Sequence, residues 1–147
     1  MSDNLHALDA ELERLLNAVD RPALRKTSRK LAQGLRKRNQ QRQAKQQDPD
    51  GSAWEPRKAQ RQTIAQRKMM LGLRKTQHFT IKQRADAILI GYTGRAARIA
   101  RVHQFGMRDK PAPKAKPVNY APRQLLGVTA SDQAWIRDQL LQQLAGR

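Results

Sequence analysis

Leucines spaced one, three and four residues apart mark the first segment of the chain as an amphipathic helix. The apolar positions that fall on one face are Leu5, Leu8, Leu12, Leu15, Leu16 and Val19. Such a stripe is typical of a helix that packs on a core. Ser2 or Asp3 can cap this helix, and its early acidic residues suit the positive end of the helix dipole. The pattern predicts an N-terminal helix that ends at about Asp20.

A second helix is predicted to start at Arg21-Pro22, because proline fits the first helical turn without loss of a hydrogen bond. Leu24, Leu31 and Leu35 share one of its faces, and that face then continues as Arg38 and Arg42. Two interpretations of this end stay open. It is either a solvated, fraying end whose aliphatic stems lie on the core, or a basic helix that contacts a partner.

The spacing of apolar residues changes in the middle of the chain. Asp48-Pro49-Asp50-Gly51 predicts a turn, and residues 57–75 predict a third, mostly polar helix. Residues 78–82 alternate between polar and apolar, and residues 87–92 form a short apolar run. Together they predict an antiparallel hairpin with a tight turn near Arg84-Ala85.

Residues 95–105 suit a short helix that ends at Gly106. We expect Ile99, Val102 and Phe105 to be buried. Residues 107–119 contain three prolines and no periodic face, so they predict an extended, flexible loop.

The last part of the chain predicts a strand and a helix. Residues 120–128 could form a third strand, which Pro122 would restrict to an edge. A final amphipathic helix follows, with Ser131 as its cap and Trp135 off its buried face. The residues expected on that face are Ile136, Leu140, Leu141 and Leu144. The predicted fold class is therefore α+β, with N-terminal helices, a small antiparallel sheet and a C-terminal helix.

Length and composition limit the number of domains and the classes of protein to which the chain can belong. The chain has 147 residues, no cysteine and a formal net charge of +18. This length predicts one domain over residues 1–147. Within it we expect a helical basic arm region at 1–47, a turn at 48–56, and the sheet with its helices at 57–147. No apolar run approaches the ~20 residues of a membrane span, and the acidic N-terminus is unlike a signal peptide, so we expect synthesis in the cytoplasm without export.

The charge lies in two blocks that contain no acidic residue. Residues 21–47 carry ten basic residues and residues 57–84 carry nine. This predicts a polyanionic partner or an acidic protein surface, against the alternative of an ordinary solvated face. Aromatic residues are only 4% of the chain, which disfavours base stacking and leaves nonspecific backbone contact with nucleic acid open. The candidate contact residues are Arg25, Arg29, Arg36, Lys37, Arg38, Arg42, Lys110, Lys114, Lys116 and Arg123.

The sequence carries no recognisable catalytic or metal-binding motif. The three histidines lie in three different predicted elements, and no serine lies in a nucleophile elbow. The glycines form no phosphate-binding loop. We therefore predict a protein that is not an enzyme and has no cofactor.

Three stretches in this order resemble the phage virion morphogenesis family, the tail completion proteins of contractile-tailed phages. They are RNQQRQAKQQDPDGSAWEPRK, ILIGYTGRAARIARVHQFG and YAPRQLLGVT. The matching positions are Pro49, Asp50, Gly51 and Trp54, then Gly91, Ile99, Ala100, His103, Gln104 and Gly106, then Tyr120, Arg123, Leu125, Leu126 and Gly127.

The resemblance implies a structural protein of the head–tail neck that acts late in assembly as a ring and lets the tail join a DNA-filled head. Its implied partners are a terminator, tube or sheath protein and the head connector, with genomic DNA as a second contact. It implies a location in the virion neck, and in the host cytoplasm during assembly. A small basic protein that binds nucleic acid nonspecifically is the alternative.

The residues themselves predict a role for each motif. We expect Gly51 to adopt a positive φ and Trp54 to fill a core pocket. His103 and Gln104 could bond a neighbouring subunit or their own loop. Arg123 needs a carboxylate or carbonyl partner, which a ring interface would supply. Residues 36–47 and 107–119 are candidates for arms that order on a neighbour.

Overall fold

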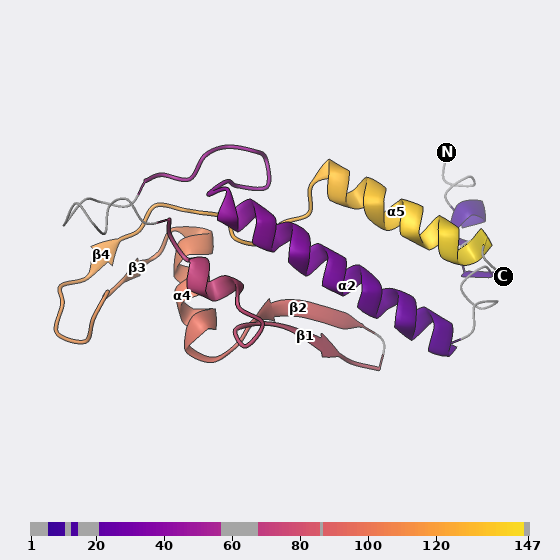
Figure 1. Ribbon diagram of the computed structural model, residues 1–147, viewed down its shortest axis with the longest axis horizontal. Coiled ribbons are helices and arrows are strands. Elements are labelled where there is room, and N and C mark those ends of the chain that lie inside the picture. The colour runs from indigo at the N-terminus through magenta and orange to yellow at the C-terminus, as the bar shows by residue number, and fades with distance from the viewer. Residues whose placement is uncertain (1–5, 11–12, 15–20, 57–67, 86, 146–147) are drawn as a thin grey trace.

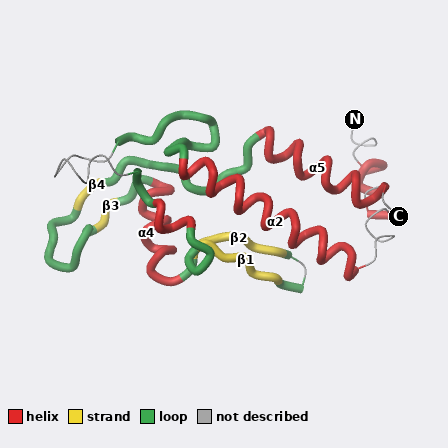
Figure 2. Tube along the Cα trace, in the orientation of Figure 1, coloured by secondary structure: helices red, strands yellow, loops and turns green. Residues whose placement is uncertain are grey.

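A long helix, α2 (Arg21–Ala44), runs through the middle of the computed structural model, which describes residues 6–10, 13–14, 21–56, 68–85 and 87–145. The C-terminal helix α5 (Ala130–Ala145) lies along one side of α2. A two-stranded hairpin lies along the other side (Figures 1 and 2). The arrangement confirms the predicted α+β fold class, and α2 starts at the predicted Arg21-Pro22 boundary.

The predicted hairpin is confirmed. Strand β1 (Phe79–Gln83) pairs antiparallel with β2 (Ile88–Tyr92), so that Phe79 lies opposite Tyr92. The amide of Arg84 donates to the carbonyl of Ala87 at 2.8 Å and closes the turn. The rings of Phe79 and Tyr92 stack with centroids 4.7 Å apart, and Phe79 is fully buried beneath α2.

Helix α4 (Gly94–Phe105) ends as predicted at Gly106, whose φ of 64° is left-handed. The predicted burial of Phe105 and Ile99 is wrong, because these side chains are 69% and 41% exposed. Ala96, Ala100 and His103 form the buried face instead, and Val102 is buried beside it. Two alanines on that face allow α4 to approach the core closely, so the larger side chains lie outside.

The segment 107–119 is not simply an extended loop. Strands β3 (Arg108–Asp109) and β4 (Val118–Asn119) pair antiparallel, and the amide of Tyr120 donates to the carbonyl of Met107. The carboxylate of Asp109 forms an ion pair with the guanidinium of Arg98 of α4, at 2.6 Å. The proline-rich part lies at the tip of this β3–β4 hairpin, which extends away from the rest of the molecule (Figure 1).

The predicted third strand at 120–128 is wrong. The segment runs without strand pairing, and its amides find other acceptors. The amide of Gln124 donates to the side chain of Asp48, and those of Leu125 and Leu126 donate to Gln104. Because these side chains take the place of a neighbouring strand, the segment is extended without belonging to a sheet.

Helix α5 differs from its prediction at both the cap and the buried face. Thr129, not Ser131, caps it: the Thr129 hydroxyl accepts from the amide of Asp132, and the Asp132 carboxylate accepts from the amide of Thr129. This reciprocal pair is a capping box. The buried face carries Asp132 with half-buried Trp135 and Ile136, whereas Leu140 and Leu141 are exposed. The side chain of Leu144 is outside the described part of the chain.

Two predictions fall partly outside the described residues. Of the predicted N-terminal helix, residues 6–10 and 13–14 are described, and they are helical. Of the predicted helix at 57–75, residues 57–67 are not described. The rest contains a short 3-10 helix, η1 (Leu71–Arg74), in place of an α-helical end.

Candidate functional site

The three motif segments meet at the C-terminal end of α2. Trp54, Leu125 and Leu73 of η1 share one hydrophobic cluster with two alanines of α4. Asp48 accepts from the amide of Gln124 at 2.8 Å, and Gly127 lies against Pro49, where a Cβ would overlap the proline ring. Segment 120–127 is therefore the common partner of the other two motifs, and its bond to the first motif joins residues 76 positions apart in the sequence.

The first motif forms the predicted turn. Gly51 has a φ of 89°, and its amide donates to the carbonyl of Asp48. Asp50 accepts from the amide of Ser52 at 2.8 Å, and this bond, with one from the Ser52 side chain, lowers the pKa of the Asp50 carboxyl. Trp54 is 6% exposed and packs in the core. The predictions for Gly51 and Trp54 are confirmed.

The second motif bonds its own chain. Gln104 accepts from the amides of Leu125 and Leu126 at 2.8 and 2.9 Å and donates to the carbonyl of Leu126 at 3.0 Å. The ring of His103 meets the edge of Tyr120 at 4.9 Å between centroids, and the His103 carbonyl accepts from the amide of Arg123. We predicted that Gln104 bonds either a neighbouring subunit or its own loop, and the structure shows bonds to the loop of its own chain.

The third motif places Arg123 in the interior, where it is 5% exposed. Its Nε donates to the carbonyl of Glu55 at 2.8 Å, and its Nη2 donates to the carbonyl of Pro56 at 3.3 Å. Arg123 thus has the carbonyl partners that we expected, but they belong to its own chain. No ring interface is needed to supply them.

Arg38 and Arg42, both half-buried, form a cluster with buried Asp132 that joins α2 to α5. Arg42 donates to Asp132 at 2.8 Å, to Asn39 at 2.6 Å and to the carbonyl of Gly127 at 2.8 Å. Arg38 donates to Asp132 at 3.3 Å, and its guanidinium lies 4.9 Å from the ring centroid of Trp135. The interpretation of this end as solvated and fraying is wrong, because these arginines hold two helices together.

Asp132 was not among the residues that the sequence singled out, although it is only 1% exposed. Burial raises the pKa of its carboxyl, but the bonds from the Thr129 amide and from Arg42 outweigh burial, and the pKa lies below its ordinary value. The spacing of Thr129 and Asp132 was the available signal, since a threonine followed three residues later by an acid is typical of a helix start.

Two buried amides complete the contacts of α2. Gln43 is fully buried and donates to the Tyr92 hydroxyl at 2.6 Å and to the Leu125 carbonyl at 3.1 Å. Burial raises the pKa of Tyr92 to about 12. Asn39 accepts from the amide of Gly127 at 3.1 Å. Both lie in a polar, glutamine-rich run, and no sequence pattern distinguished them from its solvated members.

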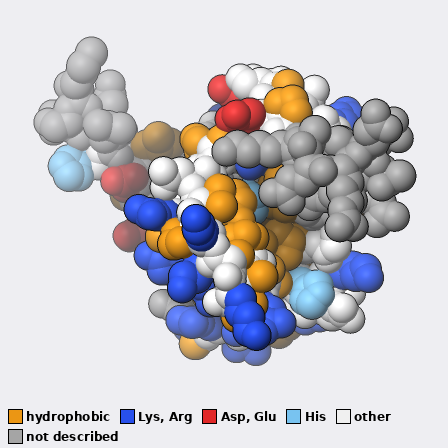
Figure 3. Space-filling view, turned by 90° about the vertical axis from the view of Figure 1, so that its left-hand side faces the viewer, with side chains coloured by type: hydrophobic (Ala, Val, Ile, Leu, Met, Phe, Trp, Pro, Cys, Tyr) orange, Lys and Arg blue, Asp and Glu red, His pale blue; other side chains and the backbone are white. Residues whose placement is uncertain are grey.

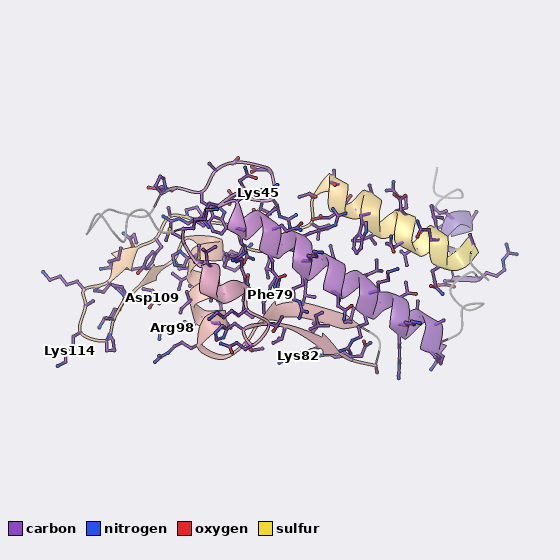
Figure 4. The ribbon with its side chains drawn as sticks, in the orientation of Figure 1. Lys45, Phe79, Lys82, Arg98, Asp109 and Lys114 are labelled. Atoms are coloured by element: carbon purple, nitrogen blue, oxygen red, sulfur yellow. The ribbon has the colours of Figure 1, made fainter. Side chains whose placement is uncertain are left out.

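The remaining predicted contact residues mostly point outward. Arg25, Arg29 and Lys37 are exposed on α2, while Arg36 is half-buried and donates to the carbonyl of Phe79 at 3.3 Å. Lys110, Lys114 and Lys116 are exposed on the β3–β4 hairpin, with Lys114 at its outer end (Figure 4). The predicted set therefore divides into an inward group that holds the fold and an outward group on two surfaces.

Comparison with known proteins gives a family match over almost the whole chain. The model of the phage virion morphogenesis family matches residues 3–145. The chain belongs to this family. It is also 31% identical over 137 residues to the tail completion protein S of Escherichia phage P2, a match that covers 88% of this chain and 90% of that protein. No solved structure matches the chain.

The match confirms the resemblance that the three motifs carried. In the described part of the chain, no helix is both long and apolar enough to cross a membrane.

Proposed function

We propose that this protein completes the head-proximal end of a phage tail and enables the tail to join the filled head. The observation that carries the proposal is the match to a tail completion protein along 90% of that protein's length. Because the match covers nearly all of both chains, the two proteins share their whole extent and not a common module alone. The role requires binding and no catalysis, so we propose a structural, non-enzymatic component of the virion.

The mechanism we propose is docking of two exposed basic surfaces onto acidic surfaces of neighbouring neck and tail proteins. One is the row on the N-terminal half of α2, formed by Arg25, Lys26, Arg29 and Lys30. The other is the β3–β4 hairpin with its lysines. Complementary charge accelerates encounter and fixes the register of an interface. Several copies of the protein would form a ring that matches the symmetry of the tail.

Nonspecific DNA binding is the second candidate, and the exposed row on α2 favours it. Four cations without an intervening acidic residue suit a phosphate backbone. Micromolar binding of duplex DNA, with an affinity that falls steeply as salt rises, would support this candidate. Affinity for tail proteins in the absence of DNA would support the first.

The hairpin lysines provide a test of the docking mechanism. We expect Lys114→Glu with Lys116→Glu to lower the yield of infectious phage by at least about tenfold in a complementation assay, because the reversed charges repel an acidic neighbour. The matched control is Lys82→Glu with Arg84→Glu on the β1–β2 hairpin, which reverses two exposed charges elsewhere. Equal yields from the two double variants would contradict docking through the β3–β4 hairpin.

A further inference from the structure

An open apolar groove lies between η1 and α4. Its volume is about 450 Å³, and its apolar wall includes Met70, Leu73 and Ile99. Ile99 is 41% exposed, whereas Ala96 and Ala100 on the inner face of α4 are buried. The space-filling view shows hydrophobic side chains gathered on this end of the molecule, with Lys, Arg and His side chains mainly on its lower half and Asp or Glu side chains at its upper edge (Figure 3). A groove of this kind can bind the apolar face of a helix.

The polar residues that line the groove are basic. They are Lys75, His78, Arg95 and His103, and no aspartate or glutamate lies among the described lining residues. Lys75 and Arg95 are exposed. The chemistry of the groove therefore favours an amphipathic helix whose apolar stripe is bordered by carboxylates.

The chain itself contains a segment of that chemistry at its N-terminus. Residues 1–20 hold five of the 12 acidic residues and only one of the 30 Lys and Arg residues. At helical spacing, Asp9 and Glu13 border its leucine stripe on one side and Glu11 on the other. The described residues 6–10 are helical and exposed, and Leu8 is 54% exposed, so this apolar side chain is not covered by its own chain.

This segment and the groove are far apart in one molecule. Figure 1 places residues 6–10 at the end of the long axis where α5 ends, whereas α4 and η1 lie in the other half of that axis. We propose that the acidic N-terminal segment of one copy, which includes the helical residues 6–10, docks in the groove of the next copy. The two surfaces differ, so the contact is head-to-tail, and such contacts close into rings when the rotation between copies allows it. The inference rests on the proposed ring and identifies the interface that builds it.

The absence of cysteine makes this contact directly testable by cross-linking. Leu8→Cys and Ile99→Cys, combined in the full-length protein, place one thiol on the helix and one in the groove. In assembled tails, a short bifunctional thiol reagent should then give a ladder of covalent multimers on a denaturing gel. The matched control combines Leu8→Cys with Leu89→Cys, whose side chain on β2 is 43% exposed and does not line the groove. It should give no ladder.

Charge reversal adds a second measurement. We expect Asp9→Lys with Glu13→Lys, or Lys75→Glu with Arg95→Glu, to weaken self-association in sedimentation by about tenfold. The variant that carries all four changes should recover it. Thermal unfolding of each variant shows that the fold is intact.

The outcomes separate this inference from the proposed function. A missing ladder, a ladder equal to that of the control, or a cross-link confined to one chain would overturn docking between copies. Loss of head–tail joining in Lys75→Glu with Arg95→Glu while the ladder persists would also overturn it, since the groove would then bind a different protein. In each case the proposed role in tail completion would stand, because electron microscopy of particles made without the protein tests that role independently.

Discussion

Asp132 determines that two basic residues of α2 take part in the fold. It lies in the C-terminal helix of a strongly basic chain, and its buried carboxylate pairs with both Arg38 and Arg42. Arg38 and Arg42, which the sequence predicts as partner contacts, therefore stabilise the packing of α2 on α5. Their partner is 90 or more residues away, so no local pattern could reveal the pairing.

Removal of this carboxylate should destabilise the protein strongly. We expect Asp132→Ala to lower the free energy of unfolding by about 3–5 kcal/mol, because it leaves half-buried Arg42 without its charge partner and removes the side-chain half of the capping box of α5. Urea denaturation followed by circular dichroism measures the change. Asp138→Ala, at an exposed position of the same helix, should change stability by no more than about 0.5 kcal/mol. Similar effects of both substitutions would contradict the role of the cluster.

The same carboxylate should make stability depend on acid pH. Its pKa in the folded protein lies below the ordinary value of 3.8, so its contribution is present above that value and is lost as pH falls through the lower, folded pKa. We expect the unfolding midpoint in urea to decline below about pH 4 in the wild type. Asp132→Asn should be less stable at neutral pH and show a shallower decline. An identical decline in both proteins would refute this assignment.

At the scale of elements, the contact between α2 and α5 depends on a glycine. Gly34 lies under the ring of Trp135, and a Cβ built there would overlap that ring. Alanine favours a helix over glycine by about 1 kcal/mol, yet we expect Gly34→Ala to destabilise the protein by about 1–3 kcal/mol through this overlap. Thermal unfolding measures the change.

Two controls belong to that measurement. Gly72→Ala should be nearly neutral, because nothing lies within 4 Å of its added Cβ. Trp135→Leu should remove most of the cost of Gly34→Ala, since the smaller side chain relieves the overlap. A stabilising effect of Gly34→Ala would show that the helices do not pack through this pair.

The elements that the sequence predicted well are those with a local signal. The β1–β2 hairpin follows from alternation and a short turn, and α4 follows from its period and from Gly106. The buried face of α5 was missed because Trp135 packs on a glycine of a distant helix. Segment 120–128 was missed because side chains, Gln104 among them, take the place of a neighbouring strand. Both errors come from contacts that only the tertiary structure creates.

At the scale of the whole molecule, the charge of +18 serves two purposes. Part of it lies in buried Arg123 and half-buried Arg42, which bind the C-terminal half of the chain to the turn and to α2. Exposed basic residues of the described chain lie on α2, on α4 and on both hairpins. Charge reversal at the candidate contact residues Arg38 and Arg42 would therefore act on the fold, whereas reversal at the exposed hairpin lysines tests assembly itself.

The sequence singled out the three motifs of the candidate site but not Asn39 and Gln43, which bind the third motif to α2, or Asp132, which binds α5 to α2. The three motifs were recognised in the correct order, and they meet around segment 120–127. Gln104 bonds the amides of Leu125 and Leu126, and Trp54 and Leu125 share the core. The sequence could not separate buried basic residues such as Arg123 from exposed ones, because burial depends on the tertiary structure.

The most direct test of the central claim is electron microscopy of particles made without this protein. The account predicts DNA-filled heads and separate tails of normal length in one lysate, and joined virions when the gene is supplied in trans. Intact virions in its absence would contradict a role in joining. Empty heads or absent tails would contradict it as well, because they would place the protein at an earlier step of assembly.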